Sequence, residues 1–126
     1  LGHVIAVKPG HGPNTKMAAT LKAEYQKRFN APPDFFVADG FSAASALVAG
    51  LQKAGSTDSE KLIAAMEGLT FDTPKGPMTF RKEDHQAMQD MYHFRIKVDP
   101  AFAWGVPELV REIKAAEMQV PIRNRR

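Results

Sequence analysis

Apolar residues recur at two different spacings along the chain, and these spacings divide it into predicted helices and strands. Over residues 16–29 the apolar side chains fall four positions apart, which predicts a helix with one buried face. Asn14 is its expected N-cap, and two prolines within residues 30–34 end it. The apolar positions of this helix are Met17, Leu21, Tyr25 and Phe29.

A short apolar run, FFVA at residues 35–38, precedes the longest apolar stretch of the chain. Pro33 and Gly40 bound this run, as they would bound a buried parallel strand. The sequence therefore predicts a strand that delivers the chain to a helix N-terminus. In α/β sheets, ligands bind at the carboxyl ends of strands, so this junction is a candidate site.

The stretch that follows predicts a buried helix over residues 41–54. Asp39 and Ser42 both offer side-chain oxygens for its N-cap, and Gly55 can adopt the left-handed conformation that ends a helix. The residues at helical spacing are Ala44, Leu47, Val48 and Leu51.

A second helix is predicted directly after Gly55. Thr57 and Glu60 match a capping box, and Gly68 is its expected end. Its predicted buried face consists of Leu62, Ile63 and Met66.

The next segment changes to strand character. Residues 72–77 predict a loop and residues 78–80 a short strand, while apolar and polar residues alternate over 91–98. We expect 78–80 and 91–98 to pair as an antiparallel hairpin. The alternating apolar residues are Tyr92, Phe94, Ile96 and Val98.

The two ends of the chain complete the pattern. Residues 3–7 predict a strand, and prolines and glycines interrupt the chain over 8–13. A last helix is predicted over 107–118, with Pro121 after it. The resulting order is β-α-β-α-α-β-β-α, a mixed α/β arrangement. The inner face of the last helix would carry Leu109, Val110, Ile113 and Ala116.

Composition excludes several classes of protein. The chain has 126 residues, 44% of them hydrophobic, which is typical of a globular fold, and its net charge is only +3. Basic residues gather near the end without interleaved aromatics, so nucleic acid is not an expected partner. The sequence contains no cysteine, which excludes disulfides and thiolate metal sites, and no run of membrane-spanning length.

Candidate catalytic and metal-binding residues have simpler interpretations. His85 beside Asp84 suggests a metal site or an acid–base pair, but no H-x-x-x-H spacing supports it, and a loop-stabilising hydrogen bond is the alternative. Ser42 lacks the G-x-S-x-G context of a hydrolase nucleophile. We therefore predict no enzyme activity and no cofactor.

Three motifs resemble one known family. They are ADGFSAA at residues 38–44, G-x-M-x-F at 76–80 and the Asp84-His85-Gln86 triplet before the strand at 91–98. Together they resemble the C-terminal part of type I periplasmic solute-binding proteins, the branched-chain amino acid class of ABC importer receptors. The resemblance covers essentially the whole chain.

The resemblance implies a two-lobed, Rossmann-like α/β protein of which this chain is roughly the final third. Residues 1–9 would end a lobe 2 strand and cross over, residues 10–90 would belong to lobe 1, and residues 91–126 would return to lobe 2. It also implies a periplasmic location, ABC permease subunits as partners, and a small amino acid or carboxylate as the solute.

By position, the resemblance places Ala38, Asp39 and Phe41 at the rim of lobe 1, facing the solute. Asp39 would take a ligand ammonium or hydroxyl, although a helix N-cap is the alternative role for this residue. Phe41 would line an apolar solute pocket, although a plain core position is its alternative.

Two classes of function follow. The preferred one is a solute-binding component of an ABC importer, and the alternative is an α/β interaction or structural module without solute binding. The thin predicted sheet has open edges, so we also expect pairing with a second copy or with an N-terminal part of the same protein.

Overall fold

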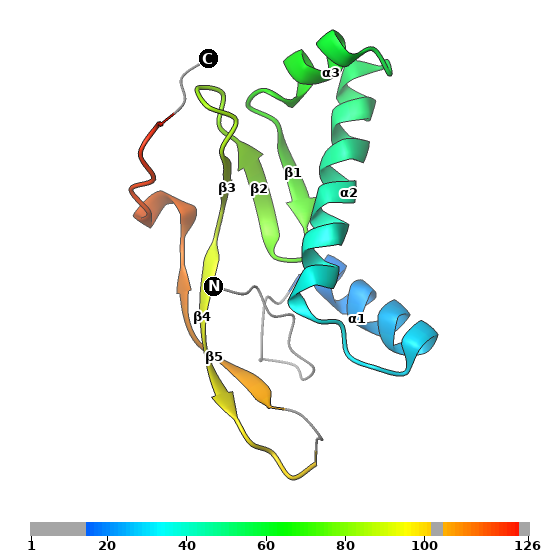
Figure 1. The fold of residues 1–126 in the computed structure, drawn as a ribbon, viewed down its shortest axis with the longest axis vertical. Helices are drawn as coiled ribbons and strands as arrows, with labels where there is room; N and C mark the ends of the chain where they lie inside the picture. Colours follow the sequence, from blue (N-terminus) through cyan, green and yellow to red (C-terminus); the bar gives the residue numbers. More distant parts are fainter. Residues whose placement is uncertain (1–14, 102–104, 124–126) are drawn as a thin grey trace.

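The computed structural model describes residues 15–101 and 105–123 and has helices on one side of two small antiparallel sheets (Figure 1). The helices are α1 (Lys16–Phe29), α2 (Phe35–Ala54) and α3 (Ser59–Met66). The strands are β1 (Thr70–Thr73), β2 (Gly76–Phe80), β3 (Ala87–Gln89), β4 (Met91–Lys97) and β5 (Val106–Ile113), followed by a 3-10 turn, η1 (Ala115–Glu117). The predicted strand at 3–7 and the interruption at 8–13 lie outside the described residues.

The first sheet has the order β1-β2-β3 and carries the core of the molecule. Phe71 pairs with Met78, and Met78 pairs with Gln89, so these three side chains lie in one row across the sheet. Ala46 of α2 packs on this row, and Leu69 completes the buried cluster. The long helix α2 thus covers the face of β1 and β2 (Figure 1).

The second sheet is the β4–β5 ribbon, which extends away from the helices (Figure 1). Asp90 separates β3 from β4, so the pairing pattern changes at this one residue. The predicted hairpin between 78–80 and 91–98 is therefore wrong: β2 pairs with β1 and β3, and the strand at 91–97 pairs with β5. The predicted loop at 72–77 is also too long, because Thr73 pairs with Gly76 across a two-residue turn.

The predicted last helix at 107–118 is wrong as well. Residues 106–113 form β5, in which Pro107 lies opposite Ile96. The spacing of its apolar residues suits either structure, and pairing with β4 decides between them. Val106, Val110 and Ile113 are β-branched, which favours the strand.

The predicted strand at 35–38 is the first turn of α2. Asp34 caps this helix, because its carboxylate accepts a hydrogen bond from the Val37 N–H at 3.0 Å. Asp39 and Ser42 are therefore not N-caps, and the Ser42 hydroxyl donates to the Ala38 carbonyl at 2.8 Å. An apolar run of four residues does not distinguish a buried strand from a buried helix.

At the other helix ends, one prediction is confirmed and two are displaced by one residue. Gly55 ends α2 in the left-handed conformation, as predicted, with φ of 58°. The N-cap of α1 is Thr15 rather than Asn14, and the N-cap of α3 is Asp58, one residue beyond the predicted Thr57. Within residues 15–101 and 105–123, no helix is both long and apolar enough to cross a membrane.

Candidate functional site

The turn between β1 and β2 is the most deeply buried polar segment of the described chain. Thr73 and Lys75 are 1% and 4% exposed, and Pro74 is fully buried. The Thr73 hydroxyl donates to the Gly76 carbonyl at 2.7 Å and accepts from the Lys75 N–H at 3.1 Å. Gly76 has φ of 108°, a conformation that side-chain-bearing residues rarely adopt. The turn is thus held in one conformation by its own residues.

Three elements that are distant in sequence converge on this turn. Thr15, the N-cap of α1, donates its hydroxyl hydrogen to the Pro74 carbonyl at 2.8 Å. Tyr92 of β4 donates to the Lys75 carbonyl at 2.6 Å. The Lys75 ammonium reaches the Asp39 carboxylate of α2, also at 2.8 Å. The turn therefore joins both sheets to both long helices.

A hollow of about 410 Å³ lies beside the Lys75–Asp39 pair, between α2 and the first sheet. Its polar lining comes from four side chains and its apolar wall from five. The polar residues are Asp39, Ser42, Lys75 and Gln89, and the apolar ones are Ala43, Ala46, Phe71, Met78 and Phe80. A space of this size with apolar walls and a few polar groups suits part of a small organic molecule.

One polar atom of this hollow is unsatisfied. The Gln89 Oε1 atom is buried and has no hydrogen-bond partner among the described residues. A buried acceptor without a donor costs free energy, so Gln89 lowers the stability of this part of the core.

The residues predicted to face a solute lie on different sides of α2. Asp39 lines the hollow just described, with a half-exposed side chain. Ala38 is fully buried against Leu21, which leaves its side chain no access to the hollow. Phe41 is 38% exposed and lines a second, smaller hollow on the other flank of the helix, together with Met17 and Val48.

Lys75 and Gln89 are the site residues that the sequence analysis missed. The P-K-G sequence at residues 74–76 is a typical turn signal, but it does not reveal that the turn is buried. Gln89 faces the core only because β3 pairs with β2 in a register that places it beside Met78. Neither contact leaves a signal in the local sequence.

Asp84 and His85, although adjacent in sequence, contact different partners. Asp84 receives two hydrogen bonds from the Arg81 guanidinium, at 2.7 and 2.6 Å. His85 lies 3.3 Å from the Glu67 carboxylate, at the rim of a small hollow lined by Ile63, Met66 and Phe80. No cluster of three His, Asp or Glu side chains suited to a metal occurs in the part of the chain that the structure describes.

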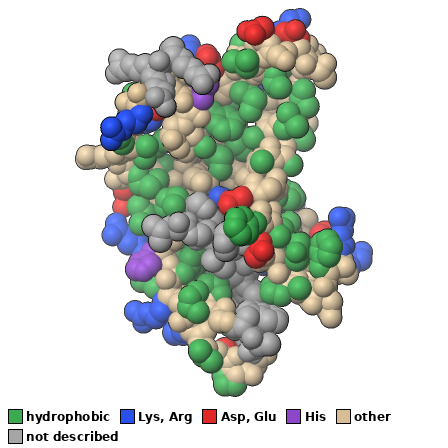
Figure 2. Space-filling view, viewed as in Figure 1, with side chains coloured by type: hydrophobic (Ala, Val, Ile, Leu, Met, Phe, Trp, Pro, Cys, Tyr) green, Lys and Arg blue, Asp and Glu red, His purple; other side chains and the backbone are tan. Residues whose placement is uncertain are grey.

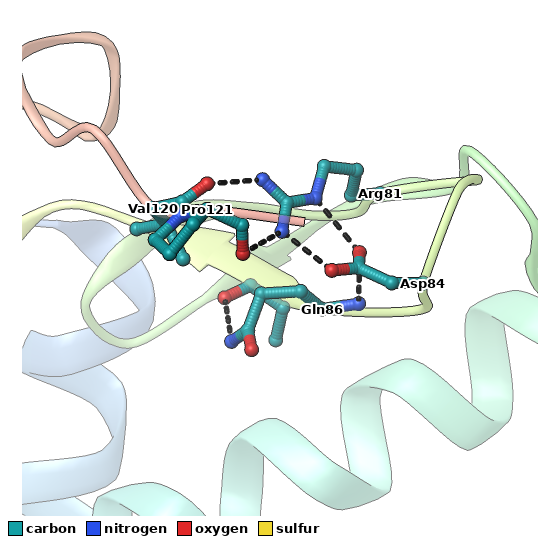
Figure 3. A network of polar contacts seen from close by, with 6 residues as sticks. Arg81, Asp84, Gln86, Val120 and Pro121 are labelled. Carbon is teal, nitrogen blue, oxygen red and sulfur yellow. Dashed lines mark hydrogen bonds and ion pairs between the residues drawn. The ribbon is translucent and has the colours of Figure 1, made fainter. Parts of the chain in front are cut away.

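Arg81 also fastens the end of the chain to the β2–β3 connection (Figure 3). The same guanidinium also donates to the carbonyls of Val120 at 2.7 Å and Pro121 at 3.2 Å. The guanidinium, helped by the Gln86 N–H, holds the pKa of Asp84 at about 2. Asp84 therefore stays a carboxylate, and Arg81 keeps its partner, over the ordinary pH range.

A second polar cluster lies where the sheets separate. Asp90 accepts hydrogen bonds from the Ala115 N–H at 2.8 Å and from the Lys114 ammonium at 2.9 Å. Although burial opposes this, these bonds lower the pKa of Asp90. The carboxylates of Glu112 and Asp90 in turn raise the pKa of Lys114. The segment after β5 is thus bound at both Asp90 and Arg81.

Comparison with known sequences shows to which protein family the chain belongs. The sequence model of the periplasmic binding protein family matches residues 2–101, which is most of the chain. The chain belongs to the periplasmic binding protein family. The resemblance seen in the ADGFSAA and G-x-M-x-F motifs is therefore confirmed, and so is the α/β class.

Solved and curated members of the family agree with this assignment. A Rhodopseudomonas palustris structure described as an ABC-type branched-chain amino acid transporter is 66% identical, with a TM-score of 0.85, over 90% of this chain and 31% of its own. A leucine-, isoleucine-, valine-, threonine- and alanine-binding protein from Pseudomonas aeruginosa is 39% identical over 67 residues, 53% of this chain and 17% of its own length. The chain therefore spans about a third or less of these relatives.

A more distantly similar solved structure shares the fold. A solute-binding protein of an ABC transporter from another R. palustris strain, solved with 3,4-dihydroxybenzoic acid, is 24% identical with a TM-score of 0.71, over 81% of this chain and 28% of its own. The arrangement of helices and strands is thus retained in a solved structure whose sequence differs widely from this chain.

Proposed function

We propose that this chain contributes one wall of the solute site of an ABC importer receptor for small amino acids or related carboxylates. The observation that carries the proposal is the 66% identity and TM-score of 0.85 to the R. palustris structure described as a branched-chain amino acid transporter. Because the chain covers 31% of that relative, the rest of the site belongs to other parts of the fold.

The hollow beside α2 supports a role in solute contact. Asp39 carries a half-exposed carboxylate that can accept from an ammonium or hydroxyl group. Phe41, on the other flank of α2, supplies an exposed ring as an apolar wall. Ala38 contributes by packing the first turns of α2 against Leu21, which holds Asp39 and Phe41 in place.

The division into lobes is also a proposal. We assign residues 10–90 to lobe 1 and residues 91–126 to lobe 2, with residues 1–9 as the end of a lobe 2 strand and the crossover. The break between the two sheets at Asp90 supports this boundary, because among the described strands β3 pairs only with β2 whereas β4 pairs only with β5.

Family membership supports three further assignments. We place the protein outside the cytoplasmic membrane, in the periplasm, with ABC permease subunits as its partners. We assign it no enzymatic step. We expect its task to be delivery of an unchanged solute, for which a closing pocket suffices.

A hybrid protein tests the proposal. The chain would replace its matching region in the R. palustris relative, and calorimetry would measure binding of branched-chain amino acids, threonine, alanine and hydroxybenzoates. The expected result is one-to-one binding of at least one amino acid, weakened about tenfold or more by Asp39→Asn and unaffected by the cap variant Asp58→Asn. A folded hybrid that binds none of these solutes would overturn the proposal.

A further inference from the structure

Charged residues are rare in α2, and one of the two does not cap the helix. In its 20 residues α2 carries only Asp39 and Lys53 as charged side chains. In the space-filling view, hydrophobic side chains lie along much of this helix, and acidic groups are visible near its N-terminal end (Figure 2). Asp34 supplies the N-cap, so the carboxylate of Asp39 is not needed to begin the helix. The charge of Asp39 therefore calls for another explanation.

The ion pair between Asp39 and Lys75 is a weak device for stability. The Lys75 side chain is 3% exposed, and its ammonium lies 2.8 Å from the Asp39 carboxylate. Burial of an ammonium costs free energy that its partner offsets only in part, and an apolar pair of similar volume often stabilises a fold equally well. What the pair does provide is direction, because a fixed ammonium selects one orientation of a half-exposed carboxylate.

The backbone of Lys75 is held at both of its polar groups. Its N–H donates to the Thr73 hydroxyl at 3.1 Å, and its carbonyl accepts the Tyr92 hydroxyl hydrogen at 2.6 Å. A lysine stem is normally flexible, but burial of this one removes that freedom. The position of the ammonium therefore follows the position of the turn.

Tyr92 connects the second sheet to this turn. It belongs to β4, which among the described strands pairs only with β5. The ring of Tyr92 stacks on the ring of Phe94, with centroids 6.2 Å apart, so the ribbon supports the ring behind the hydroxyl. Two hydrogen bonds, of 2.6 and 2.8 Å, thus connect the ribbon to the Asp39 carboxylate through one buried residue, Lys75.

We propose that Lys75 and Tyr92 are positioning residues for the Asp39 carboxylate. Tyr92 fixes the turn through the Lys75 carbonyl, and the Lys75 ammonium holds the carboxylate in one direction at the hollow that Asp39 lines. A solute with an ammonium group gains from this arrangement, because a carboxylate that is already oriented loses less freedom on binding. The inference rests on the proposed function only for the solute, since the contacts lie within this chain.

NMR of the isolated chain tests the positioning directly. The carboxyl carbon shift of Asp39 and its χ1 couplings report the orientation of its side chain. Tyr92→Phe should move both signals, although the substitution leaves Asp39 itself in place. Tyr25→Phe is the matched control, because it removes the hydroxyl of the only other tyrosine in the chain, and it should leave both signals unchanged.

Lys75→Met tests the second link separately. It keeps the Tyr92 hydrogen bond, which goes to a backbone carbonyl, and removes only the ammonium. The Asp39 signals should again move. Unchanged Asp39 signals in folded Tyr92→Phe or Lys75→Met would overturn the inference, because a residue that only stabilises the fold would not act on the carboxylate.

The hybrid protein tests the consequence for solute binding. Tyr92→Phe and Lys75→Met should each weaken amino acid binding about threefold or more, and neither should add to the loss caused by Asp39→Asn. Losses that add fully to that of Asp39→Asn would overturn the inference, since these residues would then act independently of the carboxylate. A hybrid that binds no solute would contradict only the proposed function, because the Asp39 signals of the isolated chain still decide the positioning.

Discussion

The Lys75 ammonium lies 2.8 Å from the Asp39 carboxylate and joins the β1–β2 turn to α2. The two partners differ in environment, because the Lys75 side chain is 3% exposed and that of Asp39 is 46% exposed. Removal of Asp39 would leave a buried ammonium without its carboxylate partner, whereas removal of Lys75 would leave a carboxylate in contact with water.

Asp39→Ala should therefore lower the free energy of unfolding by about 2 kcal/mol, below the usual cost of breaking a fully buried pair because Asp39 is half exposed. Lys75→Met should cost less, since the methionine retains the apolar stem and removes the buried charge. Urea denaturation of the two variants and of the double variant measures both values. Equal costs for the two single variants would contradict this account of the pair.

Asp34 rather than Asp39 caps α2. Substitution of Asp34, and not of Asp39, should therefore destabilise the chain through loss of the helix cap. Asp34→Ala should cost about 1 kcal/mol, and Asp34→Asn should cost little because asparagine caps helices equally well. Denaturant midpoints of the two variants decide this. If both substitutions had the same effect, charge rather than the hydrogen bond to Val37 would be responsible.

Local sequence signals predicted the helices better than the strands. The four-residue spacing of Leu21 and its neighbours marks α1 correctly, and Gly55 marks the end of α2, because both features act within one or two helical turns. The run at 35–38 failed because four apolar residues suit a strand or a helix equally, and the cap at Asp34 lies outside the run.

The strands and the site depend on contacts that are distant in sequence. Residues 106–113 have apolar spacing compatible with a helix, and only pairing with β4 makes them a strand. Lys75 belongs to the site because Thr15, Asp39 and Tyr92 all reach its turn. The solute-facing position that the family resemblance gives to Asp39 stays a prediction, and the burial of Ala38 follows from packing that the sequence did not show.

Tyr92 provides a pH-dependent contribution to stability. Burial, with the charge of Glu112 adding to it, raises the pKa of Tyr92 to about 12. The phenol therefore stays protonated in the folded chain at pH values where the unfolded chain, with an ordinary pKa near 10, loses its proton. Stability should fall as pH rises from about 10 to 12, because the folded state binds the extra proton.

The variant Tyr92→Phe tests this effect together with the hydrogen bond to Lys75. It should cost about 1 kcal/mol at neutral pH and should remove most of the decline above pH 10. Absorbance titration of the phenol and denaturant midpoints at several pH values provide the measurements. Ionisation of Tyr92 near pH 10 in the folded chain would contradict the buried donor role.

The contribution of Asp84 to stability depends on pH in the opposite direction, and it changes at acidic pH. Its pKa of about 2 lies below the ordinary carboxyl value, mainly because Arg81 hydrogen-bonds to the charged form. The stability that this group contributes is present above pH 4 and should be lost as pH falls from about 4 to 2. In Arg81→Met the pKa of Asp84 should rise, and contacts to the chain end at Val120 and Pro121 should loosen.

Carbon-detected NMR titration of Asp84 in both proteins measures this change, and amide exchange near residue 120 reports on the chain end. Lys82→Met, at an exposed neighbouring position, is the matched control. An unchanged pKa of Asp84 in Arg81→Met would show that the guanidinium is not its main partner.

The central claim is that this chain holds only one wall of a solute site. Calorimetry of the isolated chain against a panel of amino acids and hydroxybenzoates tests it most directly. The account predicts dissociation constants no better than about millimolar, because a solute pocket normally buries most of its ligand and this chain covers only 31% of the R. palustris relative. One-to-one binding at micromolar affinity would contradict the claim.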